Sequence, residues 1–194
     1  MGLREIKKEL KKLDKKELIN LISELYKKDK STKEFLDFYV EPNEKELFFK
    51  YKDIVFEVFY PVRGDELKLK NGKKAISDFK KFSPSSQLVA ELMLFYVSTG
   101  VDFTNDFGDI DEGFYSSLET TFVAAMKLLE KERLLEEYAE QVAIIVNKAS
   151  GIGWGFHDYI SQVHGEFYPD AQVAKNEPIE SKKGKIIYFD RKNY

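Results

Sequence analysis

The segment LVAELMLFYV, residues 88–97, constrains the fold more than any other part of the sequence. In a helix its apolar side chains point in almost every direction, so no face is left for water, and other elements must cover most of its sides. Ser83 followed by Pro84 predicts the start of this helix, since serine is a favoured N-cap and proline fits the first helical position. Gly100 predicts its end. We expect a central helix over about 84–99.

Most of the remaining chain has the three- and four-residue apolar spacing of amphipathic helices. Asp14 with Glu17 resembles a capping box and predicts a break between two N-terminal helices, and Ser31 with Glu34 predicts the start of a third. Further helices are expected over residues 43–60, 74–82, 115–129, 134–149 and 156–167. The sequence therefore predicts an all-α fold, an orthogonal or solenoid-like array of about seven to eight helices.

The helical pattern is expected to form one domain over residues 1–169, with 170–194 as a polar tail or small appendage. Two segments alternate in the manner of strands: ELKLK at 66–70 and the run containing KIIYF at 184–189. They can pair as a small β-hairpin, or the second can belong to the tail, and the pattern alone does not decide between these alternatives.

Composition narrows the classes of protein to consider. The chain has no cysteine, which excludes disulfides, thiolate metal sites and cysteine nucleophiles and suits a reducing compartment. Its charged, periodic beginning is unlike a signal peptide, and its longest apolar runs are too short for a bilayer, so we expect a cytoplasmic protein without membrane contact. The net charge of −3 gives no general reason to expect nucleic acid as a partner.

The glycine-rich segment GIGWG, from Gly151 to Gly155, admits two interpretations. A phosphate-binding loop would require a strand before it and the spacing GxGxxG, whereas here the preceding residues are helical in pattern. The alternative is a joint between two helices, with Gly151 as the left-handed C-cap of one and Gly155 as the N-cap of the next. Trp154 would then pair with Tyr159 as a hydrophobic staple.

The helix after this joint carries both histidines of the chain and Asp158 in its first turn, where a negative charge is favourable. His157 and His164 lie on one side of it, separated by about 10 Å along the axis, too far to share one metal ion. They are expected at a helix interface with hydrogen-bond partners. His157 also remains a candidate acid–base or binding residue, and Trp154 and Asp158 are candidate binding residues beside it.

The segment VDFTNDFGDIDEGFYSSLE, residues 101–119, is acidic and has no lysine or arginine. Its spacing does not fit the twelve-residue calcium loop, but another arrangement of its carboxylates can hold a divalent cation. The alternative is that these residues cap a helix or are solvated. The candidate cation ligands are Asp106, Asp109 and Asp111. The candidate binding residues of this segment are Asp102, Asp106, Asp109 and Asp111.

The N-terminal helix presents the opposite charge. Its basic residues fall on the side away from the leucine stripe: Arg4, Lys8, Lys11, Lys12 and Lys15. Nucleic-acid backbone binding is one interpretation. Against it, no aromatic residue before Tyr26 is available to stack on bases, and a solvated lysine face explains the pattern as well.

The segments ISDFKKFSPSSQLVAELMLFYVSTGVDFTNDFGDI and GIGWGFHDYI resemble an uncharacterised family of small bacterial helical proteins of unknown function. The resemblance runs from LKKLDKKELINLISELY to about Pro169. It implies a cytoplasmic, all-helical protein and supplies no catalytic residues.

Three functions are compatible with these observations. The first is a non-enzymatic protein-interaction or scaffold module that binds a protein partner or associates with itself, without a cofactor. The second is a metal-dependent enzyme that combines the acidic segment with His157. The third is nucleic-acid backbone binding through the basic N-terminal helix.

Overall fold

The computed structural model describes residues 2–62, 67 and 69–169, and this part of the chain contains nine helices and no strand. The all-α class is confirmed, with slightly more helices than the seven to eight expected. The helices are α1 (Leu3–Leu10), α2 (Lys15–Lys28), α3 (Lys30–Val40), α4 (Glu44–Phe59), α5 (Leu69–Lys80), α6 (Ser86–Phe107), α7 (Glu112–Lys131), α8 (Leu135–Lys148) and α9 (Phe156–Phe167). Within the described residues, no helix combines the length and apolar character needed to cross a bilayer.

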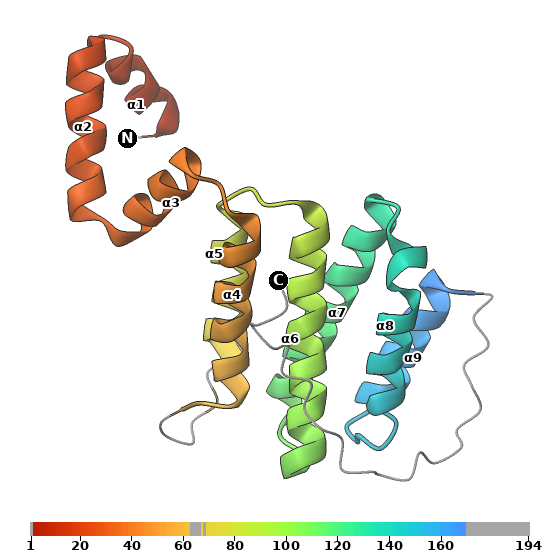
Figure 1. The fold of residues 1–194 in the computed structure, drawn as a ribbon. Coiled ribbons are helices and arrows are strands. Elements are labelled where there is room, and N and C mark those ends of the chain that lie inside the picture. Colours follow the sequence, from red (N-terminus) through yellow and green to blue (C-terminus); the bar gives the residue numbers. More distant parts are fainter. Residues whose placement is uncertain (1, 63–66, 68, 170–194) are drawn as a thin grey trace.

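Helix α6 is the centre of the fold, as its apolar sequence predicts. It packs against α4 and α5 on one side and against α7 and α8 on the other, and α9 completes the body by packing on α7 and α8 (Figure 1). Leu92, Leu94 and Val97 are fully buried on α6. Burial of large aliphatic and aromatic side chains around this helix is the main stabilising contribution to the body.

The central helix continues well beyond the predicted stop at Gly100 and ends at Phe107. Gly100 is buried, and a Cβ atom built there would lie 2.6 Å from Cδ2 of Leu118 on α7. The glycine is therefore required by the close approach of two helices, not by a helix end. The predicted start is also displaced, because Ser85 is the N-cap whereas Ser83 adopts a left-handed φ of 54°.

Helix α5 shows the same use of glycine. The Asn71-Gly72 pair, which reads as a turn in the sequence, lies inside this helix, and a Cβ at Gly72 would lie 2.4 Å from Cε2 of Tyr96. Leu69 and Lys70 are helical too, so the hairpin prediction for residues 66–70 is wrong at these two positions. Its other half, 184–189, and the rest of 170–194 lie outside the described residues.

Local capping predicted the start of α2 correctly and placed the start of α3 close to its observed position. Asp14 and Glu17 exchange two hydrogen bonds of 2.8 Å, which confirms the capping box and the break between α1 and α2. The cap of α3 is Asp29 and not Ser31: its carboxylate accepts a hydrogen bond from the amide of Thr32. A carboxylate two residues earlier satisfies the same free amides.

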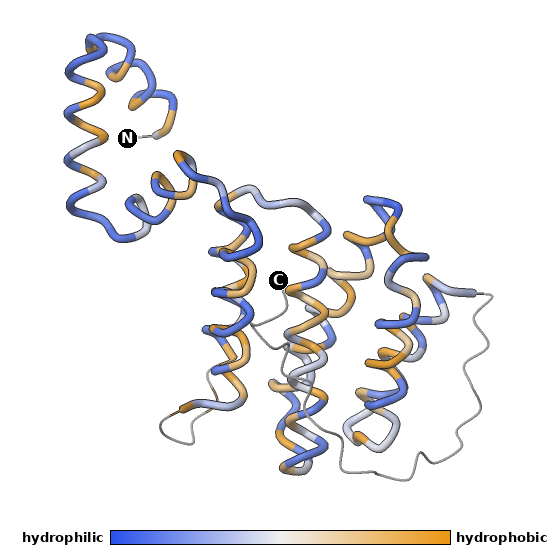
Figure 2. Tube along the Cα trace, viewed as in Figure 1, coloured by the Kyte–Doolittle hydropathy of each residue, from blue (hydrophilic) through white to orange (hydrophobic). Residues whose placement is uncertain are grey.

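Helices α1–α3 project from the body as an arm that is attached through α3 (Figure 1). The rings of Phe35 and Phe38 lie 6.3 and 5.5 Å from the ring of Phe82, and Glu34 forms an ion pair of 3.2 Å with Lys50. No residue of the three helices is buried. Figure 2 shows that the arm nevertheless carries apolar residues along its length.

The close contact at Gly72 yields a test with a matched control. We expect Gly72→Ala to lower the free energy of unfolding by about 1–3 kcal/mol, because the new methyl group overlaps the rigid, fully buried ring of Tyr96. Gly165→Ala on α9, where no atom lies within 4 Å of the added Cβ, should instead stabilise the protein by about 0.5–1 kcal/mol. Urea unfolding of both variants measures the difference, and equal effects would contradict the packing described.

Candidate functional site

The glycine-rich segment is a joint between α8 and α9. The residues AIIV belong to α8, so the strand required before a phosphate-binding loop is missing. Gly155 is the N-cap of α9 and is left-handed, with φ of 71°, and Trp154 before it is left-handed as well, with φ of 58°. Gly151 does not have the predicted left-handed conformation, because α8 already ends at Lys148, with Ala149 as its C-cap. The turn is made three residues later than expected.

The exposed residues of this joint do not form a closed site. The side chain of Trp154 is 61% exposed, and Tyr159, its predicted staple partner, is exposed as well. Asp158 lies in the first turn of α9 and points into solvent. As binding candidates, Trp154 and Asp158 therefore present an open surface.

The acidic segment touches the glycine joint through Asp109. A Cβ at Gly153 would lie 3.1 Å from Oδ2 of Asp109, and the hydroxyl of Tyr115 donates a 2.9 Å hydrogen bond to the other carboxylate oxygen. The ring of Tyr115 in turn lies 5.3 Å from that of Phe156. The two most unusual segments of the sequence are thus neighbours, and a glycine at position 153 leaves room for the carboxylate.

The other acidic candidates have separate neighbours. Asp102 on α6 forms a 2.8 Å ion pair with Lys148 on α8. Asp106 accepts a 2.7 Å hydrogen bond from the hydroxyl of Tyr60, whose pKa is raised by burial and then by this carboxylate. Asp111 is the N-cap of α7 and accepts from the amide of Phe114. Asp102 and Asp106 lie in the last turns of α6, and Asp111 caps the start of α7, so the acidic segment is mostly helical and does not form a long loop.

This geometry gives the cation hypothesis no support. Among the described residues, no three His, Cys, Asp or Glu side chains are grouped so that they could hold a metal ion. Asp106, Asp109 and Asp111 each interact with a different group, as described above. A cation at these positions therefore stays a prediction from the sequence.

The two histidines have different environments. His157 is partly exposed and interacts with residues of its own helix: Nε2 lies 3.2 Å from Oγ of Ser161, and Nδ1 lies 3.9 Å from a carboxylate oxygen of Asp158. His164 is 4% exposed, its ring lies 5.0 Å from that of Tyr168, and its Nδ1 has no hydrogen-bond partner in the described part of the chain. Burial lowers the pKa of His164, so this ring is held neutral.

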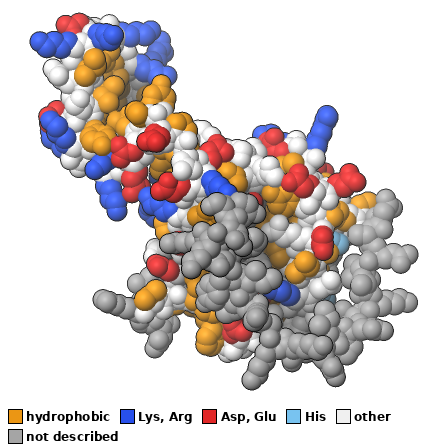
Figure 3. Space-filling model, in the orientation of Figure 1, with side chains coloured by type: hydrophobic (Ala, Val, Ile, Leu, Met, Phe, Trp, Pro, Cys, Tyr) orange, Lys and Arg blue, Asp and Glu red, His pale blue; other side chains and the backbone are white. Residues whose placement is uncertain are grey.

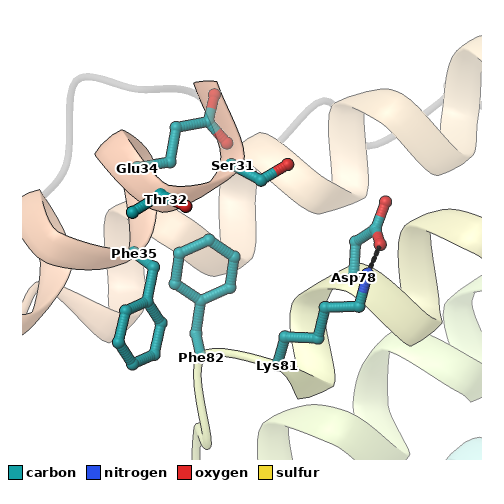
Figure 4. Close-up of a pocket in the computed structure, with 7 residues that line it drawn as sticks. All are labelled: Ser31, Thr32, Glu34, Phe35, Asp78, Lys81 and Phe82. Carbon is teal, nitrogen blue, oxygen red and sulfur yellow. Dashed lines mark hydrogen bonds and ion pairs between the residues drawn. The ribbon is translucent and has the colours of Figure 1, made fainter. Parts of the chain in front are cut away.

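A groove lies where α3 meets the end of α5 (Figure 4). Its lining residues are Ser31, Thr32, Glu34, Phe35, Asp78, Lys81 and Phe82. Asp78 pairs with Lys74 and with Lys81, and these two ammonium groups lower its pKa. The other acid of the groove, Glu34, is also paired, with Lys50. Phe35 and Phe82 form an aromatic wall. The groove is therefore the contact that joins the arm to the body.

The feature that sequence reasoning missed lies on the arm itself. Six aliphatic side chains of α1 and α2 are between 40% and 68% exposed, and we name them the N-terminal apolar face: Leu3, Ile6, Ile19, Leu21, Ile22 and Leu25. Their spacing places them on one side of each helix. In Figure 3 hydrophobic side chains gather over the arm, with basic side chains at its outer end and acidic ones toward the body. The apolar stripes were visible in the sequence, but their exposure among the described residues was not.

The basic residues proposed for nucleic-acid binding border this face. Arg4, Lys8 and Lys11 are exposed. Lys12 is paired at 2.7 Å with Glu9, one turn away. A mixed charge border around an apolar surface is typical of a protein-binding site, and phosphate-backbone binding stays a prediction.

The cation hypothesis can be tested by melting. Because Asp102, Asp106 and Asp111 already have partners, we expect the unfolding midpoint to be the same in EDTA and in calcium, magnesium or manganese. Differential scanning fluorimetry across an ion series provides the measurement. A midpoint that rises with one ion, and falls back on chelation, would show a native-state cation site after all.

The buried histidine predicts a pH dependence of stability. Since burial depresses the pKa of His164 in the folded state, the unfolded chain takes up the proton first as the pH falls. The stabilisation is therefore complete above a pH of about 6.5 and is lost below it, with a slope of at most about 1.4 kcal/mol per pH unit. His164→Phe keeps a ring beside Tyr168 and should flatten this part of the profile. Urea unfolding between mildly acidic and neutral pH checks it, and parallel profiles for both proteins would contradict the assignment.

Comparison with known proteins adds a family but no activity. A search of curated proteins found no match. A search of solved structures also found none. The model of a family of unknown function, DUF6155, matches residues 1–168, and the chain therefore belongs to that family.

Proposed function

We propose that the protein is a non-enzymatic protein-interaction module that binds its partner through the N-terminal apolar face. The observation that carries this proposal is the exposure of six aliphatic side chains on two adjacent helices in which no residue is buried. Isolated exposed apolar residues are ordinary, whereas a contiguous set with a polar border marks a docking surface.

The free energy available from burying the N-terminal apolar face fits a docking role. Completing the burial of half-exposed leucine or isoleucine side chains contributes on the order of 1 kcal/mol each. Six such residues offset a large part of the translational and rotational cost of association, which is roughly 4–15 kcal/mol. A partner with a matching apolar surface supplies the rest. The charges at the border then select the partner and its orientation.

The cytoplasm is the location that goes with this proposal. The absence of cysteine suits a reducing compartment, since proteins of oxidising compartments commonly contain disulfides. The proposal needs no cofactor, because the burial of an apolar face supplies the free energy of docking and the surrounding charges supply its specificity.

The test uses two isoleucines of nearly equal exposure. Ile22 on α2 is 48% exposed and Ile144 on α8 is 47% exposed. A photoreactive benzoylphenylalanine is placed at one position or the other, and the full chain is irradiated in the cells that produce it. We expect adducts from position 22 and not from position 144, with the attached protein identified by mass spectrometry.

Both kinds of adduct from position 22, to another protein or to the same chain, support a docking role for the face. The absence of adducts at position 22, or equal adducts at both positions, would contradict it. Ile144 is the appropriate control because its side chain has the same chemistry and similar exposure on the opposite end of the molecule from the arm.

A further inference from the structure

The two helices that flank α2 carry opposite charge. Residues 2–13, which contain α1, include five basic and two acidic side chains. Residues 29–41, which contain α3, include two basic and four acidic side chains. The arm is therefore positive along α1, at its outer end, and negative along α3, where it joins the body (Figure 1). If two copies meet with their charges in the same order, like charges face each other and repel. If one copy is reversed, unlike charges face each other and attract.

We propose that the N-terminal apolar face binds the same face of a second copy of this chain, across a two-fold axis that passes near α2. This inference rests on the proposed docking function. A two-fold axis reverses one copy relative to the other, so α1 of each copy lies over α3 of the other copy. Unlike charges are then paired at both ends, and the apolar α2 helices meet in the middle.

The arm lacks a core that a second copy would supply. Leu10, Leu13 and Leu18, around the turn from α1 to α2, are only partly buried. Leu21, Ile22 and Leu25, further along α2, are exposed. Helices of 8 and 14 residues are marginal in water without tertiary packing. When α1 of each copy lies over α3 of the other, the two α2 helices meet and these leucines lie in an interior that the two arms share.

The pairing within the arm holds the face open for this contact. The hydroxyl of Tyr26 on α2 donates a 2.9 Å hydrogen bond to Asp37 on α3, and α2 packs against α3. This contact fixes α3 at one end of α2, and the capping box at Asp14 sets the turn to α1 at the other end (Figure 1). The face between them needs no rearrangement before it binds, which lowers the cost of association.

Sedimentation equilibrium of the full chain is the first test. We expect a species of about twice the 22.6 kDa of one chain. Ile22→Glu should give the monomer, because it places a charge at the centre of the apolar contact, and Ile144→Glu should remain dimeric. Circular dichroism shows that both variants retain their helices. A wild-type protein that is monomeric up to roughly 1 mM, or an Ile22→Glu dimer, would overturn the proposal.

Disulfide trapping tests the position of the axis without placing a charge on the face. The chain has no cysteine, so each single substitution introduces the only thiol. In an isologous contact a residue near the axis meets its own copy, so Ile22→Cys should form a covalent dimer under mild oxidation and Ile144→Cys should not. Trapping at position 144 but not 22 would place the contact elsewhere and overturn the proposal.

The charge pairing has its own test. Lys8→Glu on α1 should raise the dissociation constant of the dimer about two- to twenty-fold, since each exposed pair is lost twice in a two-fold dimer. Lys127→Glu, at an exposed position on α7 in the body, should leave the dissociation constant unchanged. An unaffected Lys8→Glu dimer would overturn the reversed arrangement. A monomer in solution that still gives adducts to another protein from position 22 would retain the docking function and exclude the second copy.

Discussion

The fold depends on the burial of α6, a helix that has almost no polar side to offer water. Two glycines make this burial tight. Gly100 lets α7 approach through Leu118, and Gly72 lets α5 lie against the ring of Tyr96. The hydroxyl of Tyr96 is satisfied by Ser117 at 2.8 Å, so the ring can be buried without an unpaired polar atom. With α6 enclosed in this way, the ends of α6, α7 and α8 are fixed, and the acidic and glycine-rich segments come together at those ends.

Local patterns predicted what depends on local physics. The apolar periodicity of residues 134–149 identified α8, and the Asp14–Glu17 box identified the break after α1. Glycine was the main source of error, because the same residue serves as a helix stop and as a contact point. Gly100 was interpreted as a helix stop and Gly72 as part of a turn, and only the distance to Leu118 or Tyr96 shows that each is a contact point. A single sequence does not reveal the distance between a glycine and the side chain of another helix.

The candidate site was harder to predict than the fold, for a similar reason. Aspartates that look like a cluster in sequence are separated once α6 continues to Phe107, because successive helical positions point in different directions. Asp102 faces Lys148 and Asp106 faces Tyr60. The contact of Asp109 with Gly153 was equally invisible. Conversely, the apolar stripe of α2 has the pattern of a core-facing helix, and only its solvent exposure shows that the described part of the chain does not cover it.

The attachment of α3 determines how any assembly through the arm would be built. The arm meets the body at one end, around the ring of Phe82 and the ion pair between Glu34 and Lys50. Two molecules joined through their arms would hold their α4–α9 bodies apart, and each body would be connected to the contact through its own α3. The direction in which each body points would then depend on the packing of a few aromatic rings, so a small rotation at Phe82 would become a large displacement at α9.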